Sequence, residues 1–590
     1  MSSVEAPYEV EHVPLGTHRP IRVVCIGAGY SGLMMSIIAK ERMQHCGVDF
    51  RVYEKNTDLG GTWLLNRYPG CQCDIPSHNY AYSFDPNPDW PGYYASSEQI
   101  FDYMKQVSKR HGCDDLFAYG HEVVSAKWDD VAGVWNLVVK ADGVELDDYC
   151  HVLINASGVL KSVFNFLSSF PSQFRGSVIN WKWPNIPGIE TYQGKLMHSA
   201  EWDTSYDYSG KRLAVIGIGS SGIQILPQVT KAANHIDYFI RSQTWISPAR
   251  GINEAQDGDP ELDEQYNYVS NEIKRFHEDP EYLLGHRKAL SNRRIDEFRA
   301  SLAGPEVLDG VKKSYVVSML ERLGKGEKGQ RLASLIIPEF PVGCRRLTPG
   351  QGFLEAMVRE NVDTHWNDLD RITGEGIILR NGRTLLVDAI ICATGFDTTF
   401  KPRFPIIGQN GVNLAEKWDK EDPDAYFGIT VPQMPNYFCF IGPNSPVSNG
   451  SLVQAIQMTG VYIYNCIKKL QTQGVKSMTV TEEAVADLNE HSQAWLKDTV
   501  WAAPCRSWYK RGTTDGRIVG LYAGSCYHFA EALRHPRWED YNLEYLQQNR
   551  FHYLGNGLTL REQRKEEVSD TQTLDFDSYW RLFILPDIHT

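Results

Sequence analysis

The sequence contains no run of lysine and arginine residues that could form a basic stripe, and its formal net charge over 590 residues is −14. Proteins that bind nucleic acid need such a stripe to neutralise phosphates, so we expect no nucleic-acid partner. The first twenty residues are polar and have no apolar centre, so no secretory signal is expected. These absences favour a cytoplasmic protein.

Long uninterrupted hydrophobic runs are also missing. Residues 425–467 carry no formal charge, yet the stretch is broken by "VPQMPN" and "GPNSPVSNG". Proline, asparagine and glycine at this density prevent a continuous helix that faces lipid. We therefore expect a buried core segment here, and no membrane partner.

The twelve cysteines show neither metal-ligand spacing nor a regular framework, which suits a reducing compartment and predicts no metal site. Cys71 and Cys73 are separated by a single residue, so the CxxC pattern of a redox dithiol is absent. A disulfide reductase is disfavoured for the same reason.

The sequence does contain two similar glycine-rich turns. Each follows a β-branched run and precedes an apolar, helix-like segment, in "IRVVCIGAGYSGLMMSIIAK" and "KRLAVIGIGSSGIQILPQV". In such a strand–turn–helix unit the first glycine makes the turn, the second lets the backbone approach a pyrophosphate, and the third lets the helix pack on the strand. Two dinucleotide sites are predicted, with these glycines: Gly27, Gly29 and Gly32 in the first, and Gly217, Gly219 and Gly222 in the second. A third match, in "ERLGKGEKGQR", lacks the flanking apolar elements and predicts a solvated loop.

The ends of the next strands indicate which nucleotide each unit binds. "VDFRVYEK" finishes at Glu54, whose carboxylate can accept both hydrogen bonds of an adenosine ribose and would repel a phosphate. "HIDYFIRSQTW" finishes at Arg241 and Ser242, a cation and a hydroxyl that suit a 2′-phosphate. Arg241 could also be an ordinary surface arginine. The pattern favours FAD in the first unit and NADPH in the second.

A third strand, in "DAIICATGFDTTF", runs into Gly395 and is expected to return the chain to the FAD domain. "HVLINASGVL" is similar to it and is interpreted as an earlier, degenerate counterpart. The sequence therefore predicts an α/β fold with two Rossmann-like dinucleotide-binding domains, for FAD and NADPH, the NADPH domain being inserted in the FAD domain. The expected division is 1–160 for the first half of the FAD domain, 161–390 for the NADPH domain, and 391–590 for the second half and C-terminal segment. Residues of about 251–338 are charged and helix-patterned, which predicts a helical insertion within the NADPH domain.

Several motifs resemble those of type I Baeyer–Villiger monooxygenases. "GGTWLLNRYPGCQCD" resembles the flavin-proximal motif of that family, and "YQGKLMHSAEWD" resembles its fingerprint FxGxxxHxxxW, with Tyr192 in place of the usual Phe. The likeness continues through "FPVGCRRLTPGQGFLEAM", "ICATGFD", "PNYFCFIGPNSP" and "CRSWYKRG", so it spans nearly the whole chain. The last segments look most like fungal secondary-metabolite members.

The resemblance implies a catalytic pair. Arg346 matches the arginine that lies over the flavin in this family, and Asp74 matches the aspartate that pairs with it. An arginine there would keep a C4a-peroxyflavin in its nucleophilic form and stabilise the oxyanion of a ketone adduct, while the carboxylate would fix the arginine in place. Two alternatives stay open: Asp74 could cap a local turn, and Arg346 could be a surface residue.

The resemblance also assigns cofactor contacts. Those expected to line the flavin are Thr62, Trp63, Leu64, Leu65, Asp74, Ile75 and Tyr80. Those expected to contact NADPH are Gln72, Cys73, Ile218, Gly219, Ser220, Ser221, Gly222, Ile223, Gln224 and Trp508. His198, in the motif that joins the two domains, is interpreted as a hinge residue rather than a chemical base.

The implied function is an NADPH-dependent flavin monooxygenase that inserts one oxygen atom from O2 next to a ketone carbonyl and gives an ester or lactone. The alternative is a flavin monooxygenase that oxygenates nitrogen or sulfur, although the Trp202–Asp203 ending and Arg346 fit that class poorly. A flavin-bearing binding module without activity is a second alternative, weakened by the two intact glycine motifs. We expect a monomer or weak homo-oligomer.

Overall fold

A computed structural model describes residues 8–158, 183–248, 259–448, 450–560 and 562–563. Its first sheet has five parallel strands in the order β19-β7-β1-β2-β3. These strands are β1 (Ile21–Ile26), β2 (Val48–Glu54), β3 (Phe117–Tyr119), β7 (Val152–Asn155) and β19 (Tyr437–Cys439). β7 is buried at every position, because helices and loops cover both faces of a parallel sheet.

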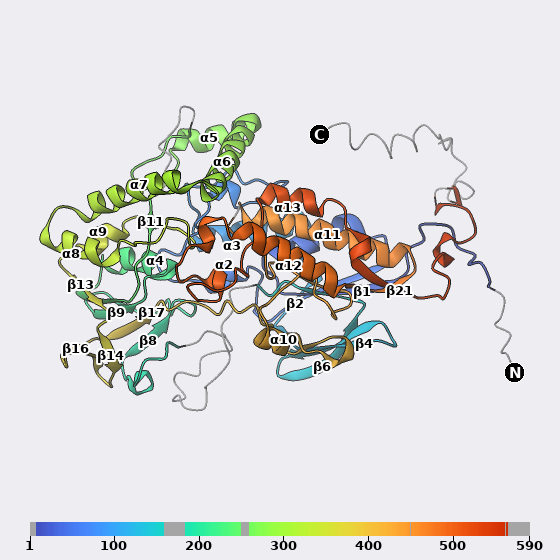
Figure 1. Ribbon diagram of the computed structural model, residues 1–590, viewed down its shortest axis with the longest axis horizontal. Coiled ribbons are helices and arrows are strands. Elements are labelled where there is room, and N and C mark those ends of the chain that lie inside the picture. Colours follow the sequence, from blue (N-terminus) through green and yellow to red (C-terminus); the bar gives the residue numbers. More distant parts are fainter. Residues whose placement is uncertain (1–7, 159–182, 249–258, 449, 561, 564–590) are drawn as a thin grey trace.

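The second sheet repeats this arrangement with five parallel strands in the order β13-β10-β9-β17-β8. They are β8 (Lys195–His198), β9 (Arg212–Ile216), β10 (His235–Ile240), β13 (Val362–Trp366) and β17 (Ala389–Cys392). The first glycine turn, at Gly27, packs against the carbonyl of Ala156, and Gly217 packs against Ala393 in the same way. The two sheets are thus the cores of two equivalent units, side by side in Figure 1.

The second unit is inserted in the first. All strands of the second sheet fall between residues 195 and 392, whereas the first sheet combines strands from residues 21–155 with β19. The predicted fold class is confirmed. One detail is corrected: β17 itself belongs to the second sheet, so the chain returns to the first unit only after Cys392. The expected boundary at 160/161 lies outside the described residues.

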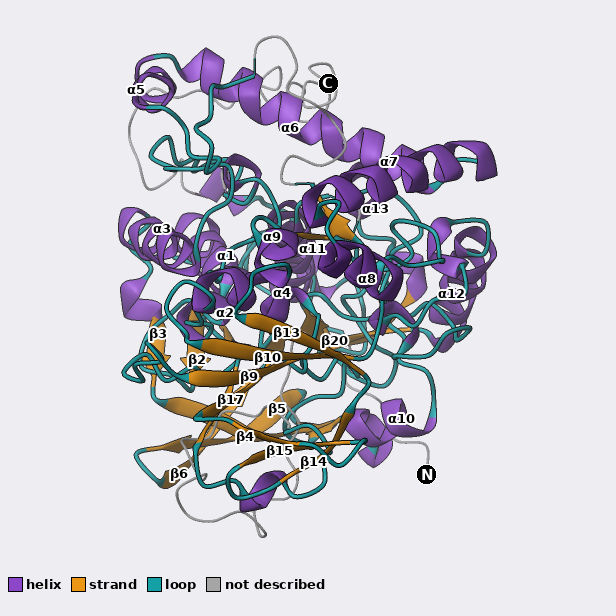
Figure 2. Ribbon diagram, turned by 90° about the vertical axis from the view of Figure 1, so that its left-hand side faces the viewer, coloured by secondary structure: helices purple, strands orange, loops and turns teal. Residues whose placement is uncertain are grey.

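Smaller sheets and helices complete the molecule. The remaining strands are β4 (His121–Asp129), β5 (Val134–Ala141), β6 (Val144–Cys150), β11 (Ile246–Ser247), β12 (Thr348–Pro349), β14 (Leu369–Ile372), β15 (Gly376–Leu379), β16 (Thr384–Leu386), β18 (Ile406–Ile407), β20 (Val475–Val480) and β21 (Tyr541–Tyr545). The helices are α1 (Tyr30–Ile38), α2 (Thr62–Leu65), α3 (Ser97–Arg110), α4 (Ser220–Val229), α5 (Ser270–Glu278), α6 (Pro280–Ser301), α7 (Pro305–Leu323), α8 (Glu327–Ile336), α9 (Phe353–Met357), α10 (Leu414–Lys420), α11 (Leu452–Thr472), α12 (Glu482–Leu496) and α13 (Cys526–Leu533). Figure 2 shows the helices α5 to α7 above the layer of strands.

The described part of the predicted helical insertion consists of α5 to α8, as its pattern indicates; residues 251–258 lie outside the described residues. α7 and α8 bury Tyr315, Met319 and Leu332 in the core of the second unit. α6 instead contacts the first unit, where Arg287 donates to the carbonyl of His78 at 3.1 Å. The prediction of a solvated loop at the third glycine match is wrong in part, because Gly329 lies inside α8 and is buried.

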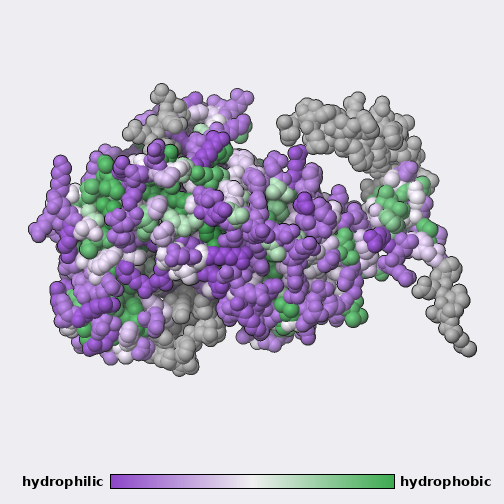
Figure 3. Space-filling view, in the orientation of Figure 1, coloured by the Kyte–Doolittle hydropathy of each residue, from purple (hydrophilic) through white to green (hydrophobic). Residues whose placement is uncertain are grey.

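The uncharged stretch of residues 425–467 contributes β19 and most of α11, and its side chains Ile456, Ile463 and Ile467 are buried in the main core. The prediction of a core segment is confirmed. Among the described residues, no helix has both the length and the apolar character needed to cross a membrane. The face shown in Figure 3 is mainly hydrophilic, with hydrophobic side chains over α7.

Candidate functional site

The first glycine turn leads into helix α1 in the predicted manner. Gly27 has a φ of +103°, and a Cβ at Gly32 would overlap the Gly27 carbonyl oxygen, so both positions require glycine. A Cβ at Gly29 would project toward the Cα of Gly61, 3.9 Å away. Gly29 precedes α1, and no side chain of the described residues caps that helix end. The first turn of α1 therefore presents backbone N–H groups, which no side chain of the described residues caps, beside a space lined by glycine; this arrangement fits a pyrophosphate.

The side chains around this turn also fit a flavin nucleotide. Glu54 lies buried at the end of β2 and accepts a hydrogen bond from the backbone N–H of Ala28 at 2.8 Å, so its carboxylate faces the glycine turn. Trp63 of α2 donates from Nε1 to the hydroxyl of Tyr80 at 3.3 Å. In the same region Thr62 is exposed, Leu64 and Leu65 are half-buried, and Ile75 is buried.

The second glycine turn has the same geometry. Gly217 has a φ of +118°, and a Cβ at Gly222 would overlap the Gly217 carbonyl oxygen. A Cβ at Gly219 would meet no atom of the described chain within 4 Å, and α4 lacks a side-chain cap there as well. Ser220 is exposed and Ser221 half-buried beside this opening. These residues fit the pyrophosphate of a second dinucleotide.

Other residues of the second turn have a different environment. Ile218 and Ile223 are buried in the core of the second unit, so any contact with a nucleotide falls to their backbone. Gln224 is also buried, and both ends of its amide are bonded to residues of the first unit. The sequence pattern did not distinguish these residues from the ones that face the opening.

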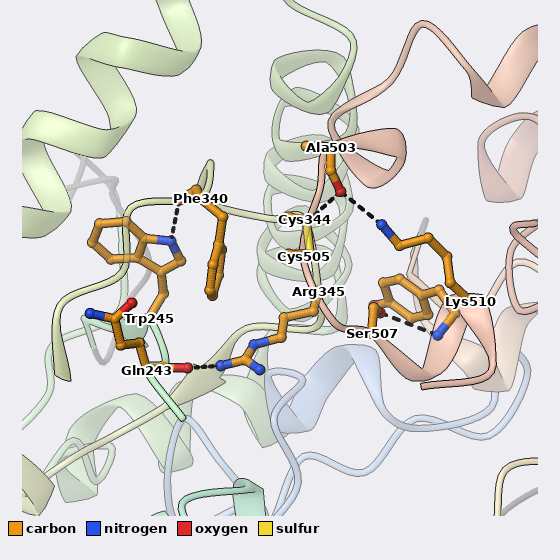
Figure 4. The surroundings of a disulfide bond; sticks show 10 residues. Gln243, Trp245, Phe340, Cys344, Arg345, Ala503, Cys505, Ser507 and Lys510 are labelled. Carbon is orange, nitrogen blue, oxygen red and sulfur yellow. Dashed lines mark hydrogen bonds between the residues drawn. A yellow bond between two sulfur atoms is a disulfide. The ribbon is translucent and has the colours of Figure 1, made fainter. Parts of the chain in front are cut away.

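Two arginines, Arg241 and Arg345, lie near the end of β10. Arg241 and Ser242 are exposed immediately after the strand. Arg345, which the sequence did not assign to this position, donates to the carbonyl oxygen of Gln243 and packs over the ring of Phe340 (Figure 4). Guanidinium groups at this strand end fit a 2′-phosphate.

Asp74 and Arg346 form a bidentate ion pair across the two units. Arg346 donates from Nε to one carboxylate oxygen at 2.5 Å and from Nη2 to the other at 2.6 Å. Nη1 donates to the carbonyl oxygen of Val447 at 2.8 Å, so two distant segments of the chain fix the guanidinium. The Asp74 side chain is 19% exposed and that of Arg346 is 34% exposed, so the pair is sheltered while part of the arginine still faces open space.

The electrostatics of the pair keep both groups charged. Burial alone would raise the pKa of the Asp74 carboxyl, but the charge and hydrogen bonds of Arg346 outweigh burial and hold the pKa below its usual value. Burial would lower the pKa of Arg346, and Asp74 reverses this and raises it. Arg294 of α6, which pairs with Glu297 at 2.6 Å, adds a second positive charge that lowers the pKa of Asp74 further.

Three more predicted site residues are Gln72 and Cys73, directly before Asp74, and Trp508 in the C-terminal segment. Gln72 is half-buried and accepts from Gln224 through its carbonyl. Burial raises the pKa of the Cys73 thiol, so it stays protonated. Trp508, half-buried, begins a single helical turn, η8 (Trp508–Lys510), and packs edge-on against Tyr509 at a ring distance of 4.7 Å.

Two predicted residues lie at the ends of strands in the second sheet. His198 ends β8; its Nδ1 accepts from the backbone N–H of Ala200 at 3.1 Å, and Nε2 lies 3.4 Å from the Thr394 hydroxyl. Burial lowers the pKa of His198 to about 4, so the ring is neutral at physiological pH. Gly395, just beyond β17, is exposed with a φ of +94°.

Sequence reasoning missed one covalent link beside the pair. Cys344 and Cys505 form a disulfide, although they are 161 positions apart (Figure 4). The sequence shows scattered cysteines without a regular framework. A disulfide is unusual in the reducing compartment that this scatter suggested. Nothing in the spacing of the twelve cysteines indicated this pairing.

Comparison with known proteins identifies the family. Residues 20–257 match the model of the flavin-binding monooxygenase-like family. The FAD-binding monooxygenase moxY of Dothistroma septosporum is 35% identical over 94% of this chain and 84% of its own. The chain belongs to the flavin-binding monooxygenase family. Its predicted enzymatic character and FAD cofactor are thereby confirmed.

More distant similarities agree with the motif resemblance. A Baeyer-Villiger monooxygenase of Pseudomonas aeruginosa is 29% identical over 88% of this chain and 90% of its own. The crystal structure of cyclohexanone monooxygenase from Rhodococcus sp. Phi1 bound to NADP+ has a TM-score of 0.73 and 22% identity, covering 89% of this chain and 100% of that one. The predicted resemblance to type I Baeyer–Villiger monooxygenases is confirmed, and the flavin monooxygenase shares its fold with these proteins.

Proposed function

We propose that this flavin monooxygenase carries out Baeyer–Villiger oxidation: with FAD, NADPH and O2 it inserts one oxygen atom beside a ketone carbonyl and releases an ester or lactone. The observation that carries the proposal is the bidentate Asp74–Arg346 pair. The names of the relatives and the NADP+ held by a structural neighbour support it.

The glycine turns would hold the two nucleotides. The first, with Glu54, suits the FAD pyrophosphate and ribose; the second, with Arg241, Ser242 and Arg345, suits NADPH. When bound, NADPH supplies the hydride and the reduced flavin supplies activated oxygen. The protein must position the ketone and keep water out.

Arg346 would stabilise negative charge on oxygen during the reaction. Its fork is oriented by Asp74 and by the Val447 carbonyl, and its exposed part faces open space. A guanidinium that is already oriented stabilises the oxyanion of a ketone adduct without further reorganisation. His198 is buried and neutral, which supports a structural role at the junction of the units over proton transfer.

A parallel assay tests the proposal. Purified enzyme is given a panel of cyclic and linear ketones, and in separate reactions a thioether, with NADPH under ¹⁸O-labelled O2. An ester or lactone carrying one labelled oxygen atom is expected, and the Arg346→Ala variant should lose it. Sulfoxide as the sole product, retained by Arg346→Ala, would instead identify a sulfur-oxygenating enzyme. NADPH consumption without any oxygenated product would reject both.

We further propose that the enzyme acts in the cytoplasm as a monomer or weak homo-oligomer. The scattered cysteines support the first part of this proposal, although Cys344 and Cys505 form a disulfide. Fluorescence microscopy of a tagged protein and sedimentation of the purified protein test the two parts.

A further inference from the structure

The Cys344–Cys505 disulfide joins two segments that both carry residues of the proposed site. Cys344 lies two residues before Arg346, and Cys505 lies three residues before Trp508. Both cysteines are buried, Cys344 completely and Cys505 to all but 3%. Figure 4 shows the bond between the second unit, where Arg345 reaches toward Gln243, and the C-terminal segment of Ser507 and Lys510.

Hydrogen bonds connect residues within the segment 503–513. Lys510 donates from Nζ to the carbonyl of Ala503 at 2.7 Å, and Arg506 donates from Nε to that of Gly512 at 2.8 Å. The backbone N–H of Gly512 returns to the carbonyl of Ser507 at 2.9 Å. These bonds close the segment into a compact turn, so a tether at Cys505 controls the position of Trp508 as well.

A second, polar link connects the same two regions. The Tyr509 hydroxyl hydrogen-bonds to Ser448, the residue after Val447, and the Val447 carbonyl accepts from Arg346. This route passes through two hydrogen bonds and the adjacent residues Val447 and Ser448, whereas the disulfide reaches the Arg346 loop directly. The covalent link is therefore the stiffer of the two.

We propose that the Cys344–Cys505 disulfide is a positioning element of the site: it holds the 503–513 segment against the Arg346 loop, and its reduction lowers turnover. The inference rests on the proposed function, because it requires Arg346 and Trp508 to take part in the proposed reaction. The chain then responds to the thiol–disulfide balance of its surroundings.

The redox step is ordinary exchange with a dithiol such as dithiothreitol. One thiolate of the dithiol attacks a sulfur of the bond, the S–S bond breaks, and a mixed disulfide forms; the second thiolate then displaces the protein thiolate. Cys344 and Cys505 together gain two electrons and two protons, and the dithiol becomes a cyclic disulfide. Since both sulfurs are buried, exchange is expected to be slower than at an exposed disulfide.

The first measurement asks whether the bond exists in solution. Unreduced, denatured protein is alkylated and digested, and the state of Cys344 and Cys505 is read by mass spectrometry. A linked peptide pair is expected. Free thiols at both positions in freshly purified protein would overturn the proposal.

The second measurement distinguishes a disulfide that positions the site from one that only stabilises the fold. The double variant Cys344→Ser/Cys505→Ser is expected to lose about tenfold in kcat at 25 °C, because small displacements at a reacting centre are costly. The wild type should lose as much after dithiothreitol and recover after oxidised glutathione, and the double variant should respond to neither. The control is Cys46→Ser, a half-buried free cysteine remote from both segments in sequence. A lower Tm with unchanged kcat and KM would show a structural staple only and reject the proposal.

A third measurement is independent of turnover and of the proposed reaction. Amide hydrogen exchange across residues 503–513 should quicken on reduction in the wild type and be quick from the start in the double variant. If no ester forms with any ketone but exchange still changes in this way, the proposed function fails while the tether stands. Exchange that is unaffected by reduction would reject the tether itself.

Discussion

Gln224 of the second unit donates a hydrogen bond from its Nε2 to the carbonyl oxygen of Gln72 in the first unit, 3.0 Å away. Its Oε1 accepts from the hydroxyl of Tyr68 at 2.9 Å. The side chain is 8% exposed, and the bond joins residues 152 positions apart. One amide thus joins α4, which begins at the second glycine turn, to the segment that leads to Asp74.

Replacing this amide should loosen the junction. Gln224→Ala removes one hydrogen-bond partner from the buried Tyr68 hydroxyl and one from the Gln72 carbonyl, at a cost of about 1–3 kcal/mol in the free energy of unfolding. Because α4 then shifts relative to the first unit, the KM for NADPH is expected to rise as well. Urea unfolding and initial-rate kinetics measure the two effects. Lys231→Ala, at an exposed position beyond the same helix, is the control and should leave both quantities unchanged.

The ion pair gives a second prediction. Arg346→Lys keeps the charge but loses the bidentate fork, so ester formation should fall by about a hundredfold or more while the protein still folds. Asp74→Asn keeps the shape and removes the charge, and it should reduce ester formation because the arginine is no longer fixed. NADPH oxidation and ester yield are measured side by side. Arg346→Lys with wild-type ester yield would show that the fork geometry does not matter.

The glycine turns give a third prediction, which separates binding from folding. A Cβ at Gly222 overlaps the backbone oxygen of Gly217, so Gly222→Ala should lower the free energy of unfolding by about 1–3 kcal/mol. A Cβ at Gly219 meets only open space within the described chain, so Gly219→Ala should fold normally yet bind NADP+ more weakly. Chemical unfolding and titration with NADP+ check the pair. Equal losses of stability in the two variants would contradict the assignment of Gly219 to the nucleotide.

Local patterns in the sequence predicted much of this architecture. The spacing of Gly27, Gly29 and Gly32 predicts the turn, because a Cβ at Gly32 would overlap the carbonyl oxygen of Gly27 only five residues away. Glu54 is predicted as the last residue of the next strand. Periodicity alone could not show that Ile223 and Gln224 turn away from the opening, because that depends on how two distant units pack.

Long-range contacts were harder to predict. The pairing of Asp74 with Arg346, 272 positions apart, was predicted through a family resemblance and not from spacing. The disulfide was missed because a bond between residues 344 and 505 leaves no mark on either local sequence. Arg294 was missed because the sequence pattern of α6 is equally consistent with a helix face that is exposed to solvent.

His198 gives a prediction for the dependence of stability on pH. The unfolded chain binds a proton at this residue below about pH 6.5, whereas burial keeps the folded ring neutral until about pH 4. Between these values the unfolded state holds the extra proton, so the stabilisation is complete above pH 6.5 and declines as the pH falls toward 4.

The loss can be isolated with one variant. By pH 5 the wild type should have lost about 2 kcal/mol through this residue alone, and His198→Asn, which cannot titrate, should lose that much less on the same change of pH. Urea unfolding of both proteins at pH 7.5 and pH 5.0 gives the difference, in which the contributions of other histidines cancel. The asparagine oxygen can still accept from the backbone N–H of Ala200, so the local turn is kept. Parallel losses in the two proteins would mean that His198 is accessible to protons in the folded state, and the argument for a neutral residue at the junction would fail.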